Sequence, residues 1–212
     1  MTEKLNSTFD YYYQGRDFYF GFEPLEGMQE IIKVLKPKGR IVALDLGCGE
    51  GRDSIFLAEN GIKVLSIDVS RTGIKKLTDY ALDHKLPITA KCIDLFSFDF
   101  SENSFDIIVA RTLLDHLEYD KIELAVKIIK RSVRKRGFAF IEVFTEDDPG
   151  FTGSKEKASE CAGLVKYYFK KGELKSMFND FRIIKYQEKT YLDTSHGTPH
   201  YHGVAILIGQ KS

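Results

Sequence analysis

The chain has few cysteines, no net charge and no long hydrophobic run, and each absence excludes a class of protein. Its three cysteines, Cys48, Cys92 and Cys161, are odd in number and lack CxxC spacing, which argues against a disulfide framework and a cysteine zinc site. Because 31 Lys and Arg residues balance 31 Asp and Glu residues, the bulk charge attracts neither nucleic acid nor an anionic membrane. No run approaches the ~18 apolar residues of a membrane span, and no secretory h-region opens the sequence. We therefore expect a cytoplasmic protein with a small-molecule partner and no nucleic-acid or membrane partner, either a monomer or a homodimer.

Short apolar runs alternate with segments of helical periodicity, which is typical of an α/β protein. The runs predict strands at 41–44, 64–67, 88–93, 105–110 and 138–143, and the periodic segments predict helices at 24–35, 53–60, 70–82 and 120–133. Asp120 and Glu123 have the spacing of a capping box at the start of the fourth helix. Right-handed crossovers between such elements predict a single domain, residues 1–212, with a doubly wound, Rossmann-like parallel sheet and helices on both faces.

The two ends of the chain depart from this alternation. Residues 145–170 form a turn-rich insertion that we expect near the substrate side, and a short helix is predicted at 171–178. Strands are predicted at 183–192 and 204–209, and the loop between them, Asp193 to Tyr201, is too short for a helical crossover. These last two strands should therefore be antiparallel to each other. Residues 1–23 are rich in aromatics and are expected to form a lid.

The strongest local signal is the glycine-rich turn Asp45-Leu46-Gly47-Cys48-Gly49-Glu50-Gly51, which follows the first predicted strand and precedes a helix. Glycines there permit positive φ angles and a close approach of the backbone to a ligand, and the helix N-terminus offers free amides. A dinucleotide fingerprint, GxGxxG, would need a third glycine at position 52, which is Arg52. The spacing therefore disfavours an NAD(P)-dependent oxidoreductase without excluding it.

Three acids, Asp45, Asp68 and Asp94, stand at the ends of the first three predicted strands. A dinucleotide carries two phosphate charges, whereas S-adenosylmethionine carries a sulfonium and an ammonium against one carboxylate, so three acids suit the latter. Asp68 also follows Gly47 by 21 residues, the distance at which a second-strand carboxylate reaches ribose hydroxyls. The acids therefore favour S-adenosylmethionine as the cofactor. Two plainer interpretations stay open: Asp68 as a helix cap shared with Ser70, and Asp94 as an ordinary surface residue.

At these residues the chain resembles the class I S-adenosylmethionine-dependent methyltransferases, and the resemblance runs in order across nearly all 212 residues. ALDLGCGEG is similar to the first motif of that family. The resemblance implies a seven-stranded sheet, mostly parallel with the last strand antiparallel, in agreement with the loop-length argument. YFGFEP at 19–24, KKGEL at 170–174 and the histidine-rich end are similar to the tellurite-resistance and thiopurine-like small-molecule methyltransferases. The substrate of the tellurite enzymes is not carried over.

The resemblance also implies roles for individual residues. Asp45 and the backbone of Gly47 to Gly51 would hold the methionine end, Asp68 both ribose hydroxyls, and Asp94 the adenine amine. The segment that begins at Arg111 would line the sulfonium and acceptor side. The predicted cofactor contacts are Asp45, Gly47, Cys48, Gly49, Gly51, Asp68, Val69, Asp94, Leu95, Arg111, Tyr12 and Tyr19.

Three histidines, His196, His200 and His202, lie in or beside the last loop, which should emerge at the carboxyl edge of the sheet. His196 and His200 are the predicted proton acceptors for a hydroxyl or amine acceptor, with Arg111 orienting an anionic group. A soft anionic acceptor would need no general base. The spacing HxxxHxH contains three good metal ligands, but Gly197 and Pro199 equally suit a plain hairpin, so no metal is assigned.

The sequence thus predicts methyl transfer from S-adenosylmethionine to a small-molecule acceptor by in-line displacement. Two alternatives remain open. One is a non-catalytic S-adenosylmethionine-binding subunit or sensor, which would lack an acceptor-sized pocket beside the methyl group. The other is the NAD(P)-dependent oxidoreductase.

Overall fold

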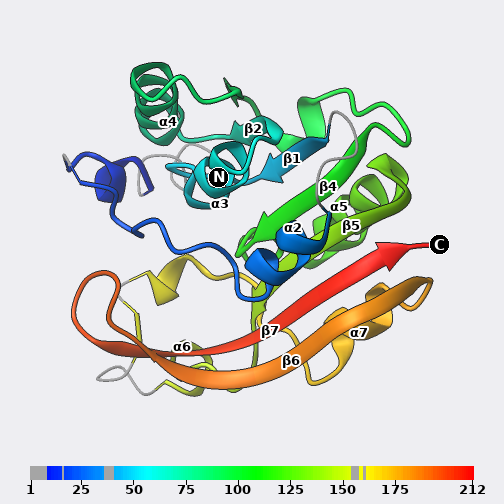
Figure 1. Ribbon diagram of the computed structural model, residues 1–212. Coiled ribbons are helices and arrows are strands. Elements are labelled where there is room, and N and C mark those ends of the chain that lie inside the picture. Colours follow the sequence, from blue (N-terminus) through cyan, green and yellow to red (C-terminus); the bar gives the residue numbers. More distant parts are fainter. Residues whose placement is uncertain (1–8, 16, 36–40, 154–157, 160) are drawn as a thin grey trace.

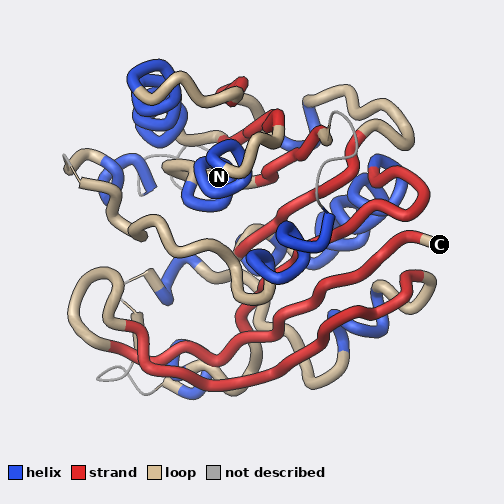
Figure 2. The backbone as a smooth tube through the Cα atoms, viewed as in Figure 1, coloured by secondary structure: helices blue, strands red, loops and turns tan. Residues whose placement is uncertain are grey.

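A computed structural model describes residues 9–15, 17–35, 41–153, 158–159 and 161–212 (Figures 1 and 2). Residues 1–8 and 16 of the predicted lid, and 154–157 and 160 of the predicted insertion, lie outside the described residues. Within the described ranges, no helix combines the length and the apolar character needed to cross a membrane. The helices and strands are α2 (Met28–Leu35), β1 (Val42–Leu46), α3 (Arg52–Glu59), β2 (Lys63–Asp68), α4 (Arg71–Asp83), β3 (Ile88–Cys92), η1 (Leu95–Ser97), β4 (Phe105–Arg111), η2 (Leu114–His116), α5 (Tyr119–Ser132), β5 (Val133–Phe144), α6 (Pro149–Thr152), η3 (Ala162–Leu164), α7 (Glu173–Met177), β6 (Phe181–Asp193) and β7 (His200–Lys211).

Seven strands form one sheet in the order β3-β2-β1-β4-β5-β7-β6. Strands β1 to β5 run parallel to one another, β7 is antiparallel to β5, and β6 is antiparallel to β7. The predicted fold class is therefore confirmed, including the reversed last strand. In such a sheet the carboxyl ends of β1 to β5 meet at one edge, and this is the edge where α/β folds bind their ligands.

The sheet is covered on both faces because its strands bury alternate residues on opposite sides. Ala43 of β1 packs in one core cluster with Met28 of α2 and Leu57 of α3. Leu44, the next residue, packs in the other cluster with Ile129 of α5. Figures 1 and 2 show α2 and α3 against one face and α5 against the other. This period of two therefore buries both faces of the sheet.

Two predicted helix starts are wrong. The first helix begins at Met28 rather than at Pro24, because Gly27 has a φ of 87° and the amide of Leu25 donates to the carboxylate of Asp53 instead. The fourth helix also lacks the predicted capping box at Asp120: α5 begins at Tyr119, its N-cap is Glu118, and no described side chain caps its N-terminus.

The C-terminal hairpin is longer than the sequence pattern predicts, because β6 and β7 continue beyond their apolar residues. His200 pairs with Asp193 across the two strands, and only residues 194–199 form the loop. His200 and His202 therefore lie on β7, whereas His196 lies in the loop. Figure 1 shows this hairpin reaching past the rest of the sheet toward the N-terminal segment.

Substitution of Gly51 by alanine should destabilise the fold markedly. Gly51 has a φ of 90°, and a Cβ there would overlap the side chain of Leu77 on α4. Gly61 is the matched control, since its φ is 79° but no described atom lies within 4 Å of a Cβ built there. We expect Gly61→Ala to cost about 1–2 kcal/mol for the left-handed backbone alone. Gly51→Ala should cost about 1–3 kcal/mol more for the overlap. Urea unfolding measures both, and equal losses would contradict the close approach of Leu77.

Candidate active site

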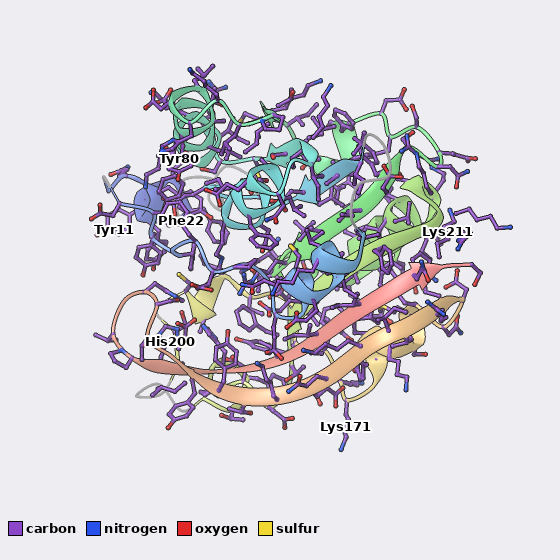
Figure 3. All side chains as sticks on the ribbon, in the orientation of Figure 1. Tyr11, Phe22, Tyr80, Lys171, His200 and Lys211 are labelled. Atoms are coloured by element: carbon purple, nitrogen blue, oxygen red, sulfur yellow. The ribbon has the colours of Figure 1, made fainter. Side chains whose placement is uncertain are left out.

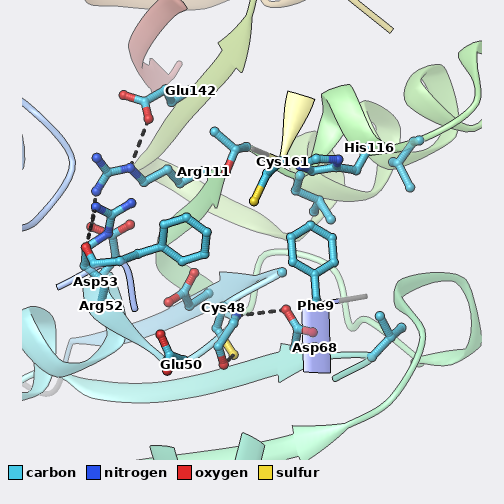
Figure 4. A pocket seen from close by; sticks show the side chains of 18 of the residues that line it. Phe9, Cys48, Glu50, Arg52, Asp53, Asp68, Arg111, His116, Glu142 and Cys161 are labelled. Atoms are coloured by element: carbon cyan, nitrogen blue, oxygen red, sulfur yellow. Dashed lines mark hydrogen bonds and ion pairs between the residues drawn. The ribbon is translucent and has the colours of Figure 1, made fainter. Parts of the chain in front are cut away.

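A cavity of about 820 Å³ opens at the carboxyl edge of the sheet, within the size range of small-molecule sites (Figure 4). It extends from the glycine turn after β1 to the ends of β2, β4 and β5, and on to the β6–β7 hairpin. Nine of the predicted cofactor contacts line it: Asp45, Gly47, Cys48, Gly49, Asp68, Val69, Asp94, Leu95 and Arg111. Gly51, the N-cap of α3, closes the turn without lining the cavity.

The glycine turn is held by backbone hydrogen bonds and by Asp68. The amides of Gly47 and Cys48 both donate to the carbonyl of Ile67, which ties the turn to β2. Asp68 accepts the amide of Gly49 at 2.8 Å on Oδ2 and the amide of Ser70 at 2.7 Å on Oδ1. Figure 4 shows the first of these bonds beside Cys48. Asp68 therefore joins the turn after β1 to the start of α4.

Ser70, and not Asp68, supplies the side-chain cap of α4, so Asp68 is not needed for that purpose. Ser70 is the N-cap of α4, and its hydroxyl accepts the amide of Gly73 at 2.9 Å. Each oxygen of Asp68 accepts one amide and so keeps a second lone pair for another donor. Burial raises the pKa of Asp68, against the lowering effect of the amides of Ser70 and Gly49. A hydroxyl or cationic ligand at this carboxylate would restore the interactions that burial removes.

Asp45 lies beneath the turn and is buried. Its Oδ2 accepts the hydroxyl of Ser54 at 2.6 Å, and Ser54 in turn lies 2.7 Å from the hydroxyl of Ser66. Burial, followed by the charge of Asp53, raises the pKa of Asp45 to about 7, against the lowering effect of Ser54. A bound cation would stabilise the ionised form of this side chain.

Asp94 lies at the third strand end and accepts the amide of Phe96 at 2.7 Å, as the N-cap of η1. Its carboxylate therefore has a local structural partner and also borders the cavity. The predicted contact with adenine stays a prediction.

Arg111, at the end of β4, is held in place by neighbouring carboxylates. Its Nε donates to Glu142 at 3.0 Å, and a terminal nitrogen lies 3.7 Å from Asp53 and donates to the carbonyl of Glu23 (Figure 4). Burial lowers the pKa of Arg111, but the negative charges of Glu142 and Asp53 have the larger combined effect, so the pKa is raised above its usual value. Beside it, Arg52 donates to the carbonyl of Phe20, so these two cations tie the N-terminal segment to the sheet.

The N-terminal aromatic segment lies against the glycine turn, with a helical stretch at 9–13. A Cβ on Gly49 would come within 2.6 Å of the hydroxyl of Tyr13, so this buried side chain packs directly on the turn. Phe9 and Phe20 also line the cavity, and Phe20 contacts His196 with ring centroids 4.7 Å apart. The segment thus spans from the turn to the hairpin, as a lid would.

Tyr12 and Tyr19, two of the predicted cofactor contacts, are not among the described residues that line the cavity; Tyr13 and Phe20, one position further along, occupy that wall. Contact of Tyr12 and Tyr19 with the cofactor stays a prediction. Tyr12 and Tyr19 pack on each other with centroids 5.1 Å apart. The amide of Tyr19 donates to Glu50 at 2.7 Å, and Glu50 also pairs with Lys76. The helical turn at 9–13 decides which rings face inward, and the aromatic pattern alone did not reveal it.

The insertion forms the opposite wall through Ser159, Cys161 and Lys166. His116 stacks edge-on against Phe9 with centroids 5.2 Å apart, and its Nδ1 lies 3.0 Å from the carbonyl of Leu164. Burial lowers the pKa of His116, so the ring is neutral at physiological pH. The described part of the insertion therefore borders the cavity, and its contact with substrate stays a prediction.

The predicted proton acceptors differ in their placement. His196 borders the cavity, and burial, partly opposed by Asp193, lowers its pKa to about 4. His200 is buried behind it, with Nδ1 2.7 Å from the carbonyl of Thr198 and Nε2 2.9 Å from Nε2 of His202. Among the described lining residues, His202 takes the place expected for His200.

Carboxylic acids outnumber cations in the described part of this cavity. The acids are Asp45, Glu50, Asp53, Asp68, Asp94, Glu118, Glu142 and Asp193, and the basic residues are Arg52, Arg111, Lys121 and Lys166. A diphosphate would face net repulsion from this lining, whereas a sulfonium with an ammonium group would be attracted. The residues present therefore fit S-adenosylmethionine.

Sequence reasoning missed Glu50, Arg52, Asp53 and Glu142 as residues of the site. The first three adjoin the glycine turn, so their closeness to the predicted ligand was a usable signal. Glu142 had none, because only the pairing of β4 with β5 brings it opposite Arg111.

The strand order, the glycine turn after β1 and the acid at the end of β2 together define the class I S-adenosylmethionine-dependent methyltransferase fold. The solved structure of TehB from Haemophilus influenzae superposes with a TM-score of 0.71 over 98% of this chain and 67% of that chain, at 20% identity. A 1,6-didemethyltoxoflavin-N1-methyltransferase from Burkholderia thailandensis, with bound S-adenosylhomocysteine, also gives 0.71, over 98% of this chain and 87% of that one, at 21% identity.

The family described as "Tellurite resistance protein TehB" matches residues 11–199, and the chain belongs to that family. Among curated relatives, the "Probable S-adenosyl-L-methionine-dependent methyltransferase TehB" of Haemophilus influenzae is 24% identical over 194 residues. That alignment covers 89% of this chain and 63% of the relative, so this chain spans less than two thirds of the relative's length.

Proposed function

We propose that this chain is an S-adenosylmethionine-dependent methyltransferase acting on a small-molecule acceptor. The observation that carries the proposal is the acid-rich cavity at the carboxyl edge, bounded by the glycine turn and by Asp68. When bound, S-adenosylmethionine would supply an activated methyl group for in-line displacement by the acceptor. Membership of the TehB family supports the same activity.

The chain's own residues would position the two reactants. The glycine turn and Asp45 would hold the amino-acid end, and Asp68 the ribose hydroxyls. Tyr13 and Phe20 would exclude water from the reacting atoms, which strengthens the electrostatic interactions inside the site. Holding reactants at near-attack distance can lower a barrier by roughly 7–11 kcal/mol, so alignment is the main contribution of the protein.

The identity of the proton acceptor depends on the acceptor molecule. A thiolate or another soft anion would need none. For a hydroxyl or an amine, His196 is the better placed of the two predicted bases, because it borders the cavity while His200 lies behind it. Arg111 is held by Glu142 and Asp53, and it would orient an anionic group through its remaining donor capacity.

Neither the sensor nor the oxidoreductase has an observation in its favour. The balanced charge of the chain supports an acceptor that is a small molecule rather than a nucleic acid or a membrane lipid, and we propose a cytoplasmic monomer or homodimer.

Labelled methyl transfer tests the function. The chain is incubated with S-adenosylmethionine carrying a labelled methyl group and with panels of thiols, selenium and tellurium oxyanions, amines and carboxylates. We expect label in at least one panel and formation of S-adenosylhomocysteine. Tight binding of S-adenosylmethionine without transfer in any panel would favour the sensor, and thermal stabilisation by NADH alone would favour the oxidoreductase.

A further inference from the structure

Four side chains with metal-binding atoms converge at the turn of the β6–β7 hairpin. They are Asp193 at the end of β6, His196 in the loop, and His200 and His202 on β7. One ligand atom from each of the four lies within 4.8 Å of the others. Figure 3 shows His200 at this end of the hairpin, beneath the N-terminal segment.

The hydrogen bonds of two histidines fix which nitrogen faces the centre of the cluster. Nδ1 of His200 lies 2.7 Å from the carbonyl oxygen of Thr198, which can only accept, so this nitrogen carries the proton. Nδ1 of His202 lies 3.4 Å from Oδ2 of Asp148, which also accepts. The two Nε2 atoms, 2.9 Å apart, therefore turn their lone pairs toward each other.

Two opposed lone pairs at that distance repel unless a cation lies between or beside them. Two nitrogens bound to a tetrahedral zinc at about 2.0–2.1 Å lie about 3.3 Å apart, so a widening of roughly 0.4 Å would admit the ion. A single shared proton is the competing occupant. The neighbouring groups have the pattern of a metal site, and the zinc titration described below distinguishes the two occupants.

Those neighbours have the pattern found around metal-bound histidines, whose far nitrogen usually donates to a carbonyl or a carboxylate. Thr198 and Asp148 supply these acceptors, and Asp148 is itself held by the amides of Gly150 and Gly203 at 2.7 and 3.0 Å. Each imidazole on β7 therefore has an acceptor beside its Nδ1, which favours the tautomer that a metal needs.

Asp193 adds the carboxylate. Its Oδ2 lies 3.6 Å from Nδ1 of His196 and 3.9 Å from Nε2 of His202. Its side chain, like those of His196 and His202, is largely buried. Three imidazoles with one carboxylate suit zinc and the neighbouring divalent transition metals.

We propose that Asp193, His196, His200 and His202 bind a divalent transition-metal ion, with Zn²⁺ as the first ion to test. The metal site does not depend on the proposed methyl transfer, but a His196 bound to the ion could not also serve as the proton acceptor, because a neutral imidazole has a single basic lone pair. Because Asp193, His196 and His202 also line the large cavity, the ion lies in its wall on the hairpin side. It would join the two strands and the loop at the point where the N-terminal aromatic residues meet them.

The test uses the full chain, stripped with EDTA and passed over a desalting column. Titration with ZnCl₂ in a calorimeter, metal analysis and thermal unfolding should show one equivalent of zinc and a rise in the unfolding temperature. Co²⁺ in place of zinc should give visible absorption bands of nitrogen and oxygen ligands.

Variants decide whether this cluster holds the ion. The first variant, Asp193→Asn with His196→Asn, replaces one ligand at the end of β6 and one in the loop. The second, His200→Gln, replaces a ligand at the start of β7. Each should weaken zinc binding at least about tenfold, since even the loss of a partner behind a ligand costs 10–100-fold. His84→Asn is the matched control, because His84 is exposed at the end of α4. If His200→Gln does not fold by circular dichroism, the double variant alone decides. Binding of less than one equivalent of zinc by the native chain, or an unchanged zinc affinity in the double variant, would overturn the metal site and favour a proton shared between His200 and His202.

Discussion

Replacing Asp68 by alanine should weaken S-adenosylmethionine binding by roughly ten- to a hundredfold, as expected for the loss of a charge-assisted hydrogen bond worth about 1.5–3 kcal/mol. The loss has two origins. The ribose hydroxyls lose their acceptor, and the amides of Gly49 and Ser70 lose the carboxylate that holds the glycine turn to the start of α4. Calorimetric titration with S-adenosylmethionine measures the affinity.

Two control variants separate these origins from general instability. Ser70→Ala removes the N-cap of α4, at about 1 kcal/mol of stability, but leaves the carboxylate of Asp68 in place. It should lower the unfolding temperature and keep most of the affinity. Asp83→Ala removes an exposed acid at the end of the same helix and should change neither. If Asp68→Ala binds as tightly as Asp83→Ala, the ribose assignment is wrong.

Asp115 should make the protein less stable as the pH rises, and Asp115→Asn should remove that dependence. The side chain is fully buried, and no described group gives either oxygen a hydrogen bond of good geometry. Burial raises the pKa of Asp115 to about 8, partly opposed by the nearby amides of Asp115 itself and Phe144. Its carboxylate lies among other acids, Glu142 and Asp148, which raise the pKa further.

The sign follows from the two protonation states. In the unfolded chain Asp115 ionises near pH 3.9, whereas in the folded chain it stays protonated to about pH 8. Between these values the native state binds the extra proton, so its stability falls with rising pH and levels off above pH 8. Between pH 6 and pH 9 the loss should be about 2–3 kcal/mol, at 1.36 kcal/mol per pKa unit.

Urea unfolding of the native chain and of Asp115→Asn at pH 6, 7.5 and 9 measures this difference. The variant should gain stability relative to the native chain as the pH increases. In the control Asp99→Asn, which changes an exposed acid, the free energy of unfolding should follow that of the native chain at every pH. Parallel curves for Asp115→Asn would show that Asp115 is ionised in the fold or has a partner outside the described residues.

The sequence predicted the sheet well because its signals are local. The run at Ile41 to Leu44, the glycine turn behind it and Asp68 each depend on a few neighbouring residues, and the structure places them at one edge. The antiparallel last strand also followed from a local quantity, the short connection after Asp193.

Helix starts and inward-facing rings were less predictable because distant partners decide them. Leu25 was expected inside a helix, but its amide is taken by Asp53, which lies 28 positions further along. Tyr13 rather than Tyr12 reaches the cavity because the helical turn at 9–13 directs it onto Gly49. Neither contact can be predicted from the neighbouring residues in the sequence.

The sequence by itself determined the class of fold, the position of the glycine turn and the acid-rich character of the strand ends, since these depend on spacing and residue type along the chain. Only the tertiary structure decided that Glu142 fixes Arg111, that the buried Asp115 has no hydrogen-bond partner among the described residues and that Asp193 joins three histidines. The physical reason is that charge pairing and burial depend on which strands lie side by side, and strand neighbours are set by the packing of the whole sheet.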